Sequence, residues 1–281
     1  AGRPDKHNPV AGILWMLVAC LCFTASLSLV KAIQDAGLTP FQAVLFRQVF
    51  GLLLLSPVLI RSWPGILKSE VRTRHFLRAA AGLIGMSCTY YSLHLINIAE
   101  SVALQFTLPF CTMLAAVWLL GEKVRSHRVI ACAVGFAGVL IIVRPGFAEI
   151  NIGVAFALVG TAFYALSDTN ARYLARYDGI ATIMLYNFIL MIPLAGIPSI
   201  VWWVTPTLDM LPFILGFVIA GVAAQFCLTK SFGAAEASLV SPILFLRLPL
   251  LSAIGFIFFD QTTEDLTWVG AGVIFAATLW M

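Results

Sequence analysis

The sequence predicts an all-α polytopic membrane protein whose ten transmembrane helices form two inverted five-helix repeats around a central cavity. Three observations lead to this prediction. Of the 281 residues, 61% are hydrophobic and 11% are charged, whereas about a quarter of a soluble domain is charged. The hydrophobic residues form long unbroken runs, and the two halves of the chain share a residue pattern. This composition excludes a soluble globular domain.

The hydrophobic runs set the number of spans. A spanning helix needs about 20 apolar residues, so a chain of this length holds about ten of them with short loops. Runs such as 129–143 and 243–259 lack the polar–apolar alternation of membrane strands. The predicted helices are, in order, 10–32, 40–60, 76–96, 101–120, 129–143, 152–171, 180–203, 210–229, 237–259 and 266–281.

The placement of basic residues predicts the orientation in the membrane. Loops that stay in the cytoplasm are enriched in Lys and Arg. Thirteen of the 17 Lys and Arg residues lie at the amino end and in the even-numbered loops, whereas the odd-numbered loops are mainly acidic. We therefore expect a multi-pass protein of a bacterial-type inner membrane with both termini in the cytoplasm. The basic cluster from Arg72 to Arg78 is expected to contact lipid headgroups.

Residues 1–146 and 147–281 are predicted to be two copies of one five-helix unit. Ala99-Glu100 corresponds to Ala235-Glu236, which lies 136 residues later. Because five is an odd number, the second copy enters the bilayer in the opposite sense. Inverted repeats place a substrate site near the midplane and allow alternating access. Four further identities have an offset of 141: Gly12, Leu17, Val18 and Ser26 fall on Gly153, Leu158, Val159 and Ser167.

Short motifs along both halves carry a family resemblance. They are Phe46-Arg47, Tyr90-Tyr91-Ser92-Leu93, Ala99-Glu100-Ser101, Leu119-Leu120-Gly121-Glu122-Lys123, Gly135-Phe136-Ala137-Gly138-Val139, Ala235-Glu236-Ala237-Ser238 and Phe258-Phe259-Asp260. With the repeat, they resemble the EamA-type ten-helix branch of the drug/metabolite transporter superfamily. The overall pattern is most similar to exporters of aromatic and other neutral amino acids. The second half departs from the family pattern, with Asp260 where Gly-Glu is usual and Arg247 inside the ninth span.

Two arginines within predicted spans are the strongest candidates for substrate binding. Arg47 lies in the second span and Arg247 in the ninth. An arginine at membrane depth costs about 2.5 to 3.5 kcal/mol unless it faces protein or water, so both side chains are expected to point inward. A guanidinium group binds a carboxylate through two parallel hydrogen bonds. The alternative is a structural tether to helix-end carbonyls or to a buried acid.

Uncharged polar and aromatic residues extend this candidate site. In the third span, Ser87, Tyr90, Tyr91 and His94 recur at helical spacing and are expected to form one stripe. Tyrosine offers a flat apolar face and one hydroxyl to an amphipathic ligand, although packing between helices is an equal alternative. The remaining candidates are Tyr164 as a wall of the cavity, and Gln105, Asn187 and Gln225 as amide donors or acceptors; such groups also bond across helices without binding a ligand.

Two titratable residues are candidates for coupling transport to protons. His94 titrates near physiological pH when unperturbed, but it lies close to the outer surface, where a solvated histidine is the simpler interpretation. Asp168 lies within a span, where acids often mark ion paths. Arg172 follows Asp168 by four residues, which also fits an ordinary ion pair along a helix.

Several functions lack sequence support. The six cysteines lie inside apolar runs, and the four histidines form no zinc motif, so no metal, cofactor or catalytic residue is expected. No phosphate-binding loop or nucleic-acid surface is apparent. Two halves in one chain make an obligate protein partner unnecessary.

These observations predict a non-enzymatic secondary transporter of a small amphipathic metabolite, with an aromatic or neutral amino acid as the substrate. The family resemblance implies export. Two alternatives stay open, namely uptake of a nucleoside-like or vitamin-like solute and a membrane enzyme that acts on lipids.

Overall fold

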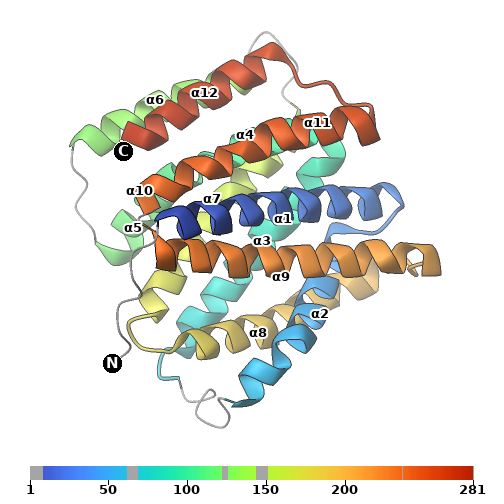
Figure 1. Cartoon of the computed structure of the whole chain (residues 1–281). Coiled ribbons are helices and arrows are strands. Elements are labelled where there is room, and N and C mark those ends of the chain that lie inside the picture. The colour runs from blue at the N-terminus through green and yellow to red at the C-terminus, as the bar shows by residue number, and fades with distance from the viewer. Residues whose placement is uncertain (1–8, 62–68, 122–125, 144–150, 236, 281) are drawn as a thin grey trace.

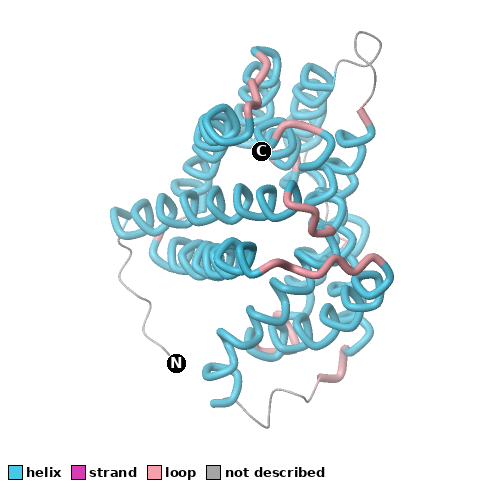
Figure 2. The backbone as a smooth tube through the Cα atoms, turned by 90° about the vertical axis from the view of Figure 1, so that its right-hand side faces the viewer, coloured by secondary structure: helices cyan, strands magenta, loops and turns pink. Residues whose placement is uncertain are grey.

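The protein is an all-α, multi-pass membrane protein. The computed structural model describes residues 9–61, 69–121, 126–143, 151–235 and 237–280, and this part of the chain contains helices and no strands (Figures 1 and 2). The first half contains α1 (Pro9–Asp35), α2 (Pro40–Arg61), α3 (Arg72–Leu95), α4 (Ile98–Gln105), α5 (Leu108–Leu120) and α6 (Ser126–Val143). The second half contains α7 (Ile152–Leu174), α8 (Ile180–Val201), η2 (Leu208–Met210), α9 (Leu211–Ala234), α10 (Ala237–Val240), η3 (Ser241–Leu246), α11 (Arg247–Phe259) and α12 (Asp265–Trp280).

Each predicted span corresponds to one continuous or broken helix. Eight spans are single helices, while α4 with α5 makes the fourth, and α10, η3 and α11 make the ninth. Among the described residues, five helical stretches are long and apolar enough to cross a membrane by themselves, and four more apolar helices are shorter. The proposed boundary between residues 146 and 147 lies outside the described residues.

The two broken spans occupy corresponding places in the two halves. Pro109 stands in the first turn of α5, and Pro242 stands at the start of the 3₁₀ segment η3. Proline has no N–H and cannot continue a helix from the preceding turn, so both spans are interrupted within the bundle. The interruptions meet, because the ring centroids of Phe106 and Phe245 are 4.1 Å apart.

The helices pair mainly between the two halves of the chain. The most extensive contacts are those of α1 with α9 and of α3 with α7, followed by α6 with α12 and α2 with α8. The pairs run antiparallel. In α1 and α9, Ser26 Oγ donates to Phe217 O over 3.2 Å, and Ser231 Oγ donates to Gly12 O over 2.7 Å.

Small residues allow the close approach of paired helices. A methyl group added at Gly160 of α7 would lie 3.0 Å from the Gly85 carbonyl oxygen of α3. A methyl group at Gly270 of α12 would lie 2.6 Å from the Gly138 carbonyl oxygen of α6. Lipid provides little hydrophobic force between helices, so membrane bundles depend on such close backbone packing.

The ends of the helices define two sides of the bundle. The first helix begins and the last helix ends on one side (Figure 1), which we call the terminal side, and the opposite side is called the far side. On the far side, Asn97 Nδ2 donates to Thr262 O over 2.9 Å, and Gln261 Oε1 accepts from Ile98 N over 3.0 Å. These bonds tie the start of α4 to the loop before α12.

Candidate functional site

The site begins with Arg47 of α2, inside the bundle. Its Nη1 donates a hydrogen bond to the Tyr90 hydroxyl of α3 over 3.0 Å. Gly221 of α9 faces this group, since a methyl group there would lie 3.8 Å from Arg47 Cζ and 3.2 Å from Ser26 Oγ. The missing side chain at Gly221 therefore leaves room for the guanidinium against the backbone of α9.

Two tyrosines from different halves lie around this arginine. Tyr90 is 2% exposed, and its ring meets Phe217 of α9 edge to face at 5.9 Å. Tyr164 of α7 packs over Gly85, where an added methyl group would lie 3.3 Å from Tyr164 Cγ. The Tyr164 phenol interacts electrostatically with Tyr90, Arg47, Arg247 and also Asp168. Tyr164 thus connects Arg47 of the first half with Arg247 of the second.

Arg247 enters from the broken ninth span. It is the first residue of α11, directly after the 3₁₀ segment η3. Its guanidinium carbon lies 5.1 Å from the ring centroid of Phe23 in α1, a cation–π distance. Its Nε atom is buried and has no hydrogen-bond partner among the described residues. We call the group formed by Arg47, Arg247, Tyr90, Tyr164 and Phe23 the central site.

The central site is positively charged and partly exposed. Arg47 and Arg247 are surrounded by protein, yet each keeps part of its surface accessible to water. The salt bridges between described residues are Lys31–Asp35 and His75–Asp178, and neither involves these arginines. The electrostatic partners of the two arginines are Tyr90, Tyr164 and Cys20. The arrangement can bind a polar ligand through guanidinium and hydroxyl groups beside aromatic faces.

A cavity separate from the central site lies toward the far side, between α2, α3, α7 and α8. It has a volume of about 460 Å³, within the range of small-molecule sites. Phe41 and Trp202 stack with centroids 6.1 Å apart and planes at 17°, and Tyr91 meets Phe156 at 4.7 Å. We call this the aromatic cavity, which is lined by Thr39, Pro40, Phe41, Ser87, Cys88, Tyr91, Phe156 and Trp202.

The predicted stripe on the third span is divided between two surroundings. Ser87 and Tyr91 line the aromatic cavity, whereas Tyr90 contacts Arg47 and His94 is exposed. Neighbouring residues on a helix of 3.6 residues per turn point about 100° apart, so Tyr90 and Tyr91 lie at opposite edges of the stripe. The stripe therefore contacts two different surroundings.

The three amides form no hydrogen bond with the central site among the described residues. Gln105 ends α4, and its Nε2 is buried without a partner in the described part of the chain. Asn187 is half-buried on α8, and Gln225 is exposed on α9. No hydrogen bond between described residues connects these three side chains with Arg47, Arg247 or the two tyrosines.

The two candidates for proton coupling lie near opposite ends of the bundle. Asp168 is exposed and interacts electrostatically with Arg78 and Arg172. His94 is exposed on the far side, near Lys31 and Asp35. Neither is a neighbour of the two central arginines.

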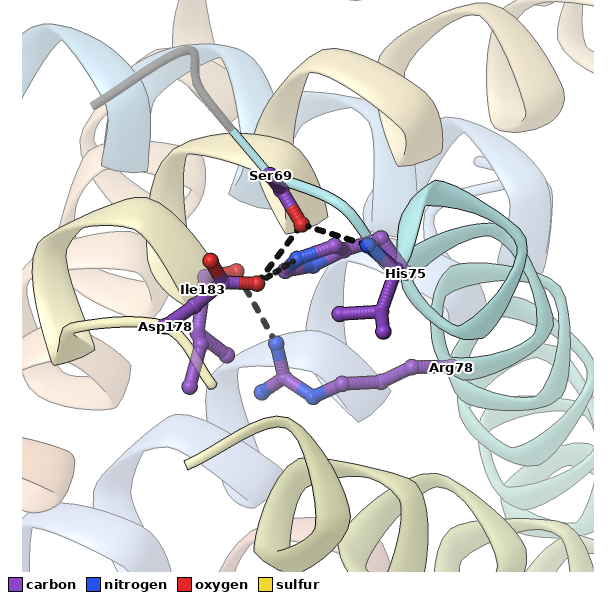
Figure 3. A network of polar contacts seen from close by, with 6 residues as sticks. Ser69, His75, Arg78, Asp178 and Ile183 are labelled. Atoms are coloured by element: carbon purple, nitrogen blue, oxygen red, sulfur yellow. Dashed lines mark hydrogen bonds and ion pairs between the residues drawn. The ribbon is translucent and has the colours of Figure 1, made fainter. Parts of the chain in front are cut away.

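A buried polar cluster on the terminal side was not foreseen from the sequence (Figure 3). His75 Nε2 lies 2.8 Å from Asp178 Oδ2, and Ser69 Oγ donates to the same oxygen over 2.7 Å. The imidazole stacks on Tyr186 at 4.4 Å. Arg78, one turn further along α3, donates to Ile183 O over 3.1 Å. The cluster fastens the start of α3 to the turn between α7 and α8. His75 and Asp178 are 103 residues apart in the sequence, so no local pattern predicts their contact.

The described residues contain no group of three or more His, Cys, Asp or Glu side chains that could bind a metal ion. All six cysteines are free thiols within helices.

Comparison with known proteins finds similarity to membrane transporters. Residues 10–144 match the EamA-like transporter family. A riboflavin transporter of Rhizobium johnstonii is 27% identical over 99% of this chain and 92% of its own length. An S-adenosylmethionine uptake transporter of Rickettsia bellii is 26% identical over 96% of this chain and 92% of its own. A crystal structure with 16% sequence identity shares the fold, with a TM-score of 0.64 over 96% of each chain.

Proposed function

Because residues 10–144 match the EamA-like transporter family, we propose that this chain belongs to that family and is a secondary transporter of a small ring-bearing metabolite of vitamin or nucleoside type. Transport proceeds by alternating access of two inverted halves, residues 1–146 and 147–281. The observation that carries the proposal is the central site, where two arginines and two tyrosines from both halves lie close together within the helical bundle.

The pairing of the helices supports the inverted repeat. A two-fold axis in the membrane plane requires a helix that packs on its own counterpart to run antiparallel to it. The counterparts α2 and α8 do so, because Phe41 near the start of α2 stacks on Trp202 after the end of α8. The same axis exchanges the pair α1–α9 with the pair α7–α3, and these two pairs have the most extensive contacts.

The interrupted spans support the position of the site. In transporters with inverted repeats, substrate sites form near the midplane at discontinuous helices. Here Phe106 and Phe245 meet at the two interruptions, and Arg247 follows the second interruption directly. The site therefore lies where the backbone is irregular in both halves.

The substrate class follows the aromatic surfaces and the relatives. The two named relatives carry riboflavin and S-adenosylmethionine, a vitamin and a nucleoside derivative, and they give no support to amino-acid export. The aromatic cavity and the rings of Phe23, Tyr90 and Tyr164 offer flat apolar faces. Such faces stack on a planar ring. This favours the vitamin-like or nucleoside-like alternative.

Counterflow in proteoliposomes tests the proposed function. Vesicles with purified full-length chain are loaded with excess unlabelled solute, and entry of labelled riboflavin, S-adenosylmethionine or phenylalanine is followed. We expect saturable exchange of a ring-bearing vitamin or nucleoside derivative. We also expect Tyr164→Ala to raise the KM about tenfold through lost aromatic contact. Trp118→Ala is the control, since Trp118 is 77% exposed on α5.

Exchange of phenylalanine alone would contradict the proposed substrate class, and exchange of no solute by correctly inserted protein would contradict transport. Vesicles of known protein orientation, with solute gradients in each direction, test the export expected from the family resemblance.

A further inference from the structure

We propose that the transported solute carries an acid group, a carboxylate or a phosphate, and that Arg47 and Arg247 bind this group together. The inference rests on the proposed transport function and adds the charge of the substrate. It also assigns one joint role to two residues that lie 200 positions apart in the sequence.

The first argument is the charge of the central site. A guanidinium group stays protonated in proteins, and a charge at membrane depth is costly unless it is paired or hydrated. Arg47 has Tyr90 and Tyr164 as electrostatic partners, and Arg247 has Cys20 and Tyr164. Neither set of partners contains a carboxylate. The site therefore holds two positive charges that those residues do not neutralise.

The second argument is the contrast with other buried cations of the same bundle. Lys31 is 5% exposed, and its Nζ lies 3.4 Å from Asp35 Oδ1 and donates to Leu93 O over 2.9 Å. Arg78 donates to Ile183 O and interacts electrostatically with Asp168, although its Nε, like that of Arg247, is buried without a partner among the described residues. These cations have an acid of this chain as a partner. The two central arginines differ because the acid they need is not among the described residues.

The third argument is the supply of donors. Arg47 gives one N–H to the Tyr90 hydroxyl, and a guanidinium has five N–H groups. The buried Nε of Arg247 has no partner among the described residues, and an unmade hydrogen bond of a buried donor is costly. An oxyanion accepts several hydrogen bonds at once and offsets that cost. Phe23 and Tyr164 beside the arginines then contact the ring of the solute.

The two arginines come from different halves, which connects binding to conformational change. Arg47 belongs to α2, and Arg247 belongs to α11. An acid group held by both guanidinium groups bridges the two halves. A neutral solute leaves two charges unpaired, and sites with buried unpaired groups discriminate strongly against such ligands. The central site is thus expected to select acids over neutral analogues with the same ring.

The test uses pairs of solutes that differ only in the acid group. The probes are riboflavin against flavin mononucleotide, and adenosine against its 5′-phosphate and its 5′-carboxylate. Binding to the purified full-length chain is measured by tryptophan fluorescence and thermal stabilisation, and transport by counterflow. We expect the acid of a pair to bind at least about tenfold more tightly than its neutral partner. The two adenosine acids distinguish carboxylate from phosphate.

Matched variants locate the effect. Arg47→Gln and Arg247→Gln should each remove most of the preference for the acid, while Arg172→Gln, at an exposed position on the terminal side, should retain it. Arg247→Lys should recover part of the preference because it restores the charge without the planar fork. Recovery with lysine shows that the preference depends on the positive charge at this position.

Equal binding of acid and neutral partners would overturn the inference, as would a preference for acids that survives both glutamine variants. In both cases, continued counterflow would leave the proposed transport function intact. Absence of counterflow for every solute would instead count against transport itself.

Discussion

At the residue scale, the sequence identified the two arginines but not their surroundings. The energetic cost of a charge at membrane depth predicted that Arg47 and Arg247 face inward, and the structure brings both to Tyr164. The contacts with Gly221 and Phe217 of α9 come from more than 120 residues away, so no local pattern predicts them. The division between Tyr90 and Tyr91 depends on the rotation of α3, which its neighbours determine.

The hydrogen bond between Arg47 and Tyr90 gives a prediction about stability and binding. Tyr90→Phe removes the hydroxyl that accepts from Arg47 Nη1, and we expect a loss of about 1 kcal/mol in the free energy of unfolding with a raised KM for transport. Thermal unfolding in detergent measures the change in stability, and counterflow measures the change in KM. Tyr173→Phe is the control, because it removes a hydroxyl whose hydrogen bond to Tyr177 is exposed on the terminal side. Unchanged stability and KM would show that the hydrogen bond contributes neither to stability nor to substrate binding.

The cluster at Asp178 gives a second prediction at this scale. Asp178→Ala leaves His75 Nε2 and Ser69 Oγ without their shared acceptor, and we expect unfolding to become easier by about 1 to 3 kcal/mol. Urea or thermal unfolding checks this value against Asp209→Ala, which alters an exposed acid in η2. Equal stability of the two variants would mean that the cluster does not fasten α3 to the turn before α8.

At the element scale, apolar run length predicted the helices well, and proline marked the two interruptions without fixing their geometry. Predicted and observed ends agree within a few residues for most spans. The splitting of the ninth span into α10, η3 and α11 could not be read from Pro242 alone, because a proline in a membrane helix also produces a simple kink.

Helix packing gives a prediction with an internal control in α12. A methyl group at Gly270 would lie 2.6 Å from the Gly138 carbonyl oxygen, whereas Gly272 has nothing within 4 Å. We expect Gly270→Ala to destabilise the protein by about 1 to 3 kcal/mol through overpacking. Gly272→Ala is expected to be neutral or stabilising by up to about 1 kcal/mol. Equal melting temperatures would exclude close packing between α6 and α12.

At the scale of the whole molecule, basic residues predicted the orientation and residue identities predicted the repeat. Neither pattern could show which helices pair, since the contacts of α1 with α9 and of α3 with α7 join opposite halves. The aromatic cavity and its volume could not be predicted from the sequence, because its walls come from four helices and the connections beside them.

The predicted orientation is checked by labelling single cysteines in a variant that lacks the six native ones. Gly179 lies on the terminal side before α8, and Thr205 lies on the far side after α8. With both termini in the cytoplasm, an impermeant maleimide applied to intact cells should label Thr205→Cys and leave Gly179→Cys unlabelled until the cells are opened. The reverse pattern would contradict the orientation.

Access to the central site from both faces of the membrane is the most direct measurement. In the cysteine-free protein, Tyr164→Cys in oriented proteoliposomes is treated with an impermeant anionic thiosulfonate from one face and then from the other. We predict reaction from each face, slowed by saturating transported solute. Reaction from one face only, or from neither, would contradict a hydrated site that opens alternately to the two sides.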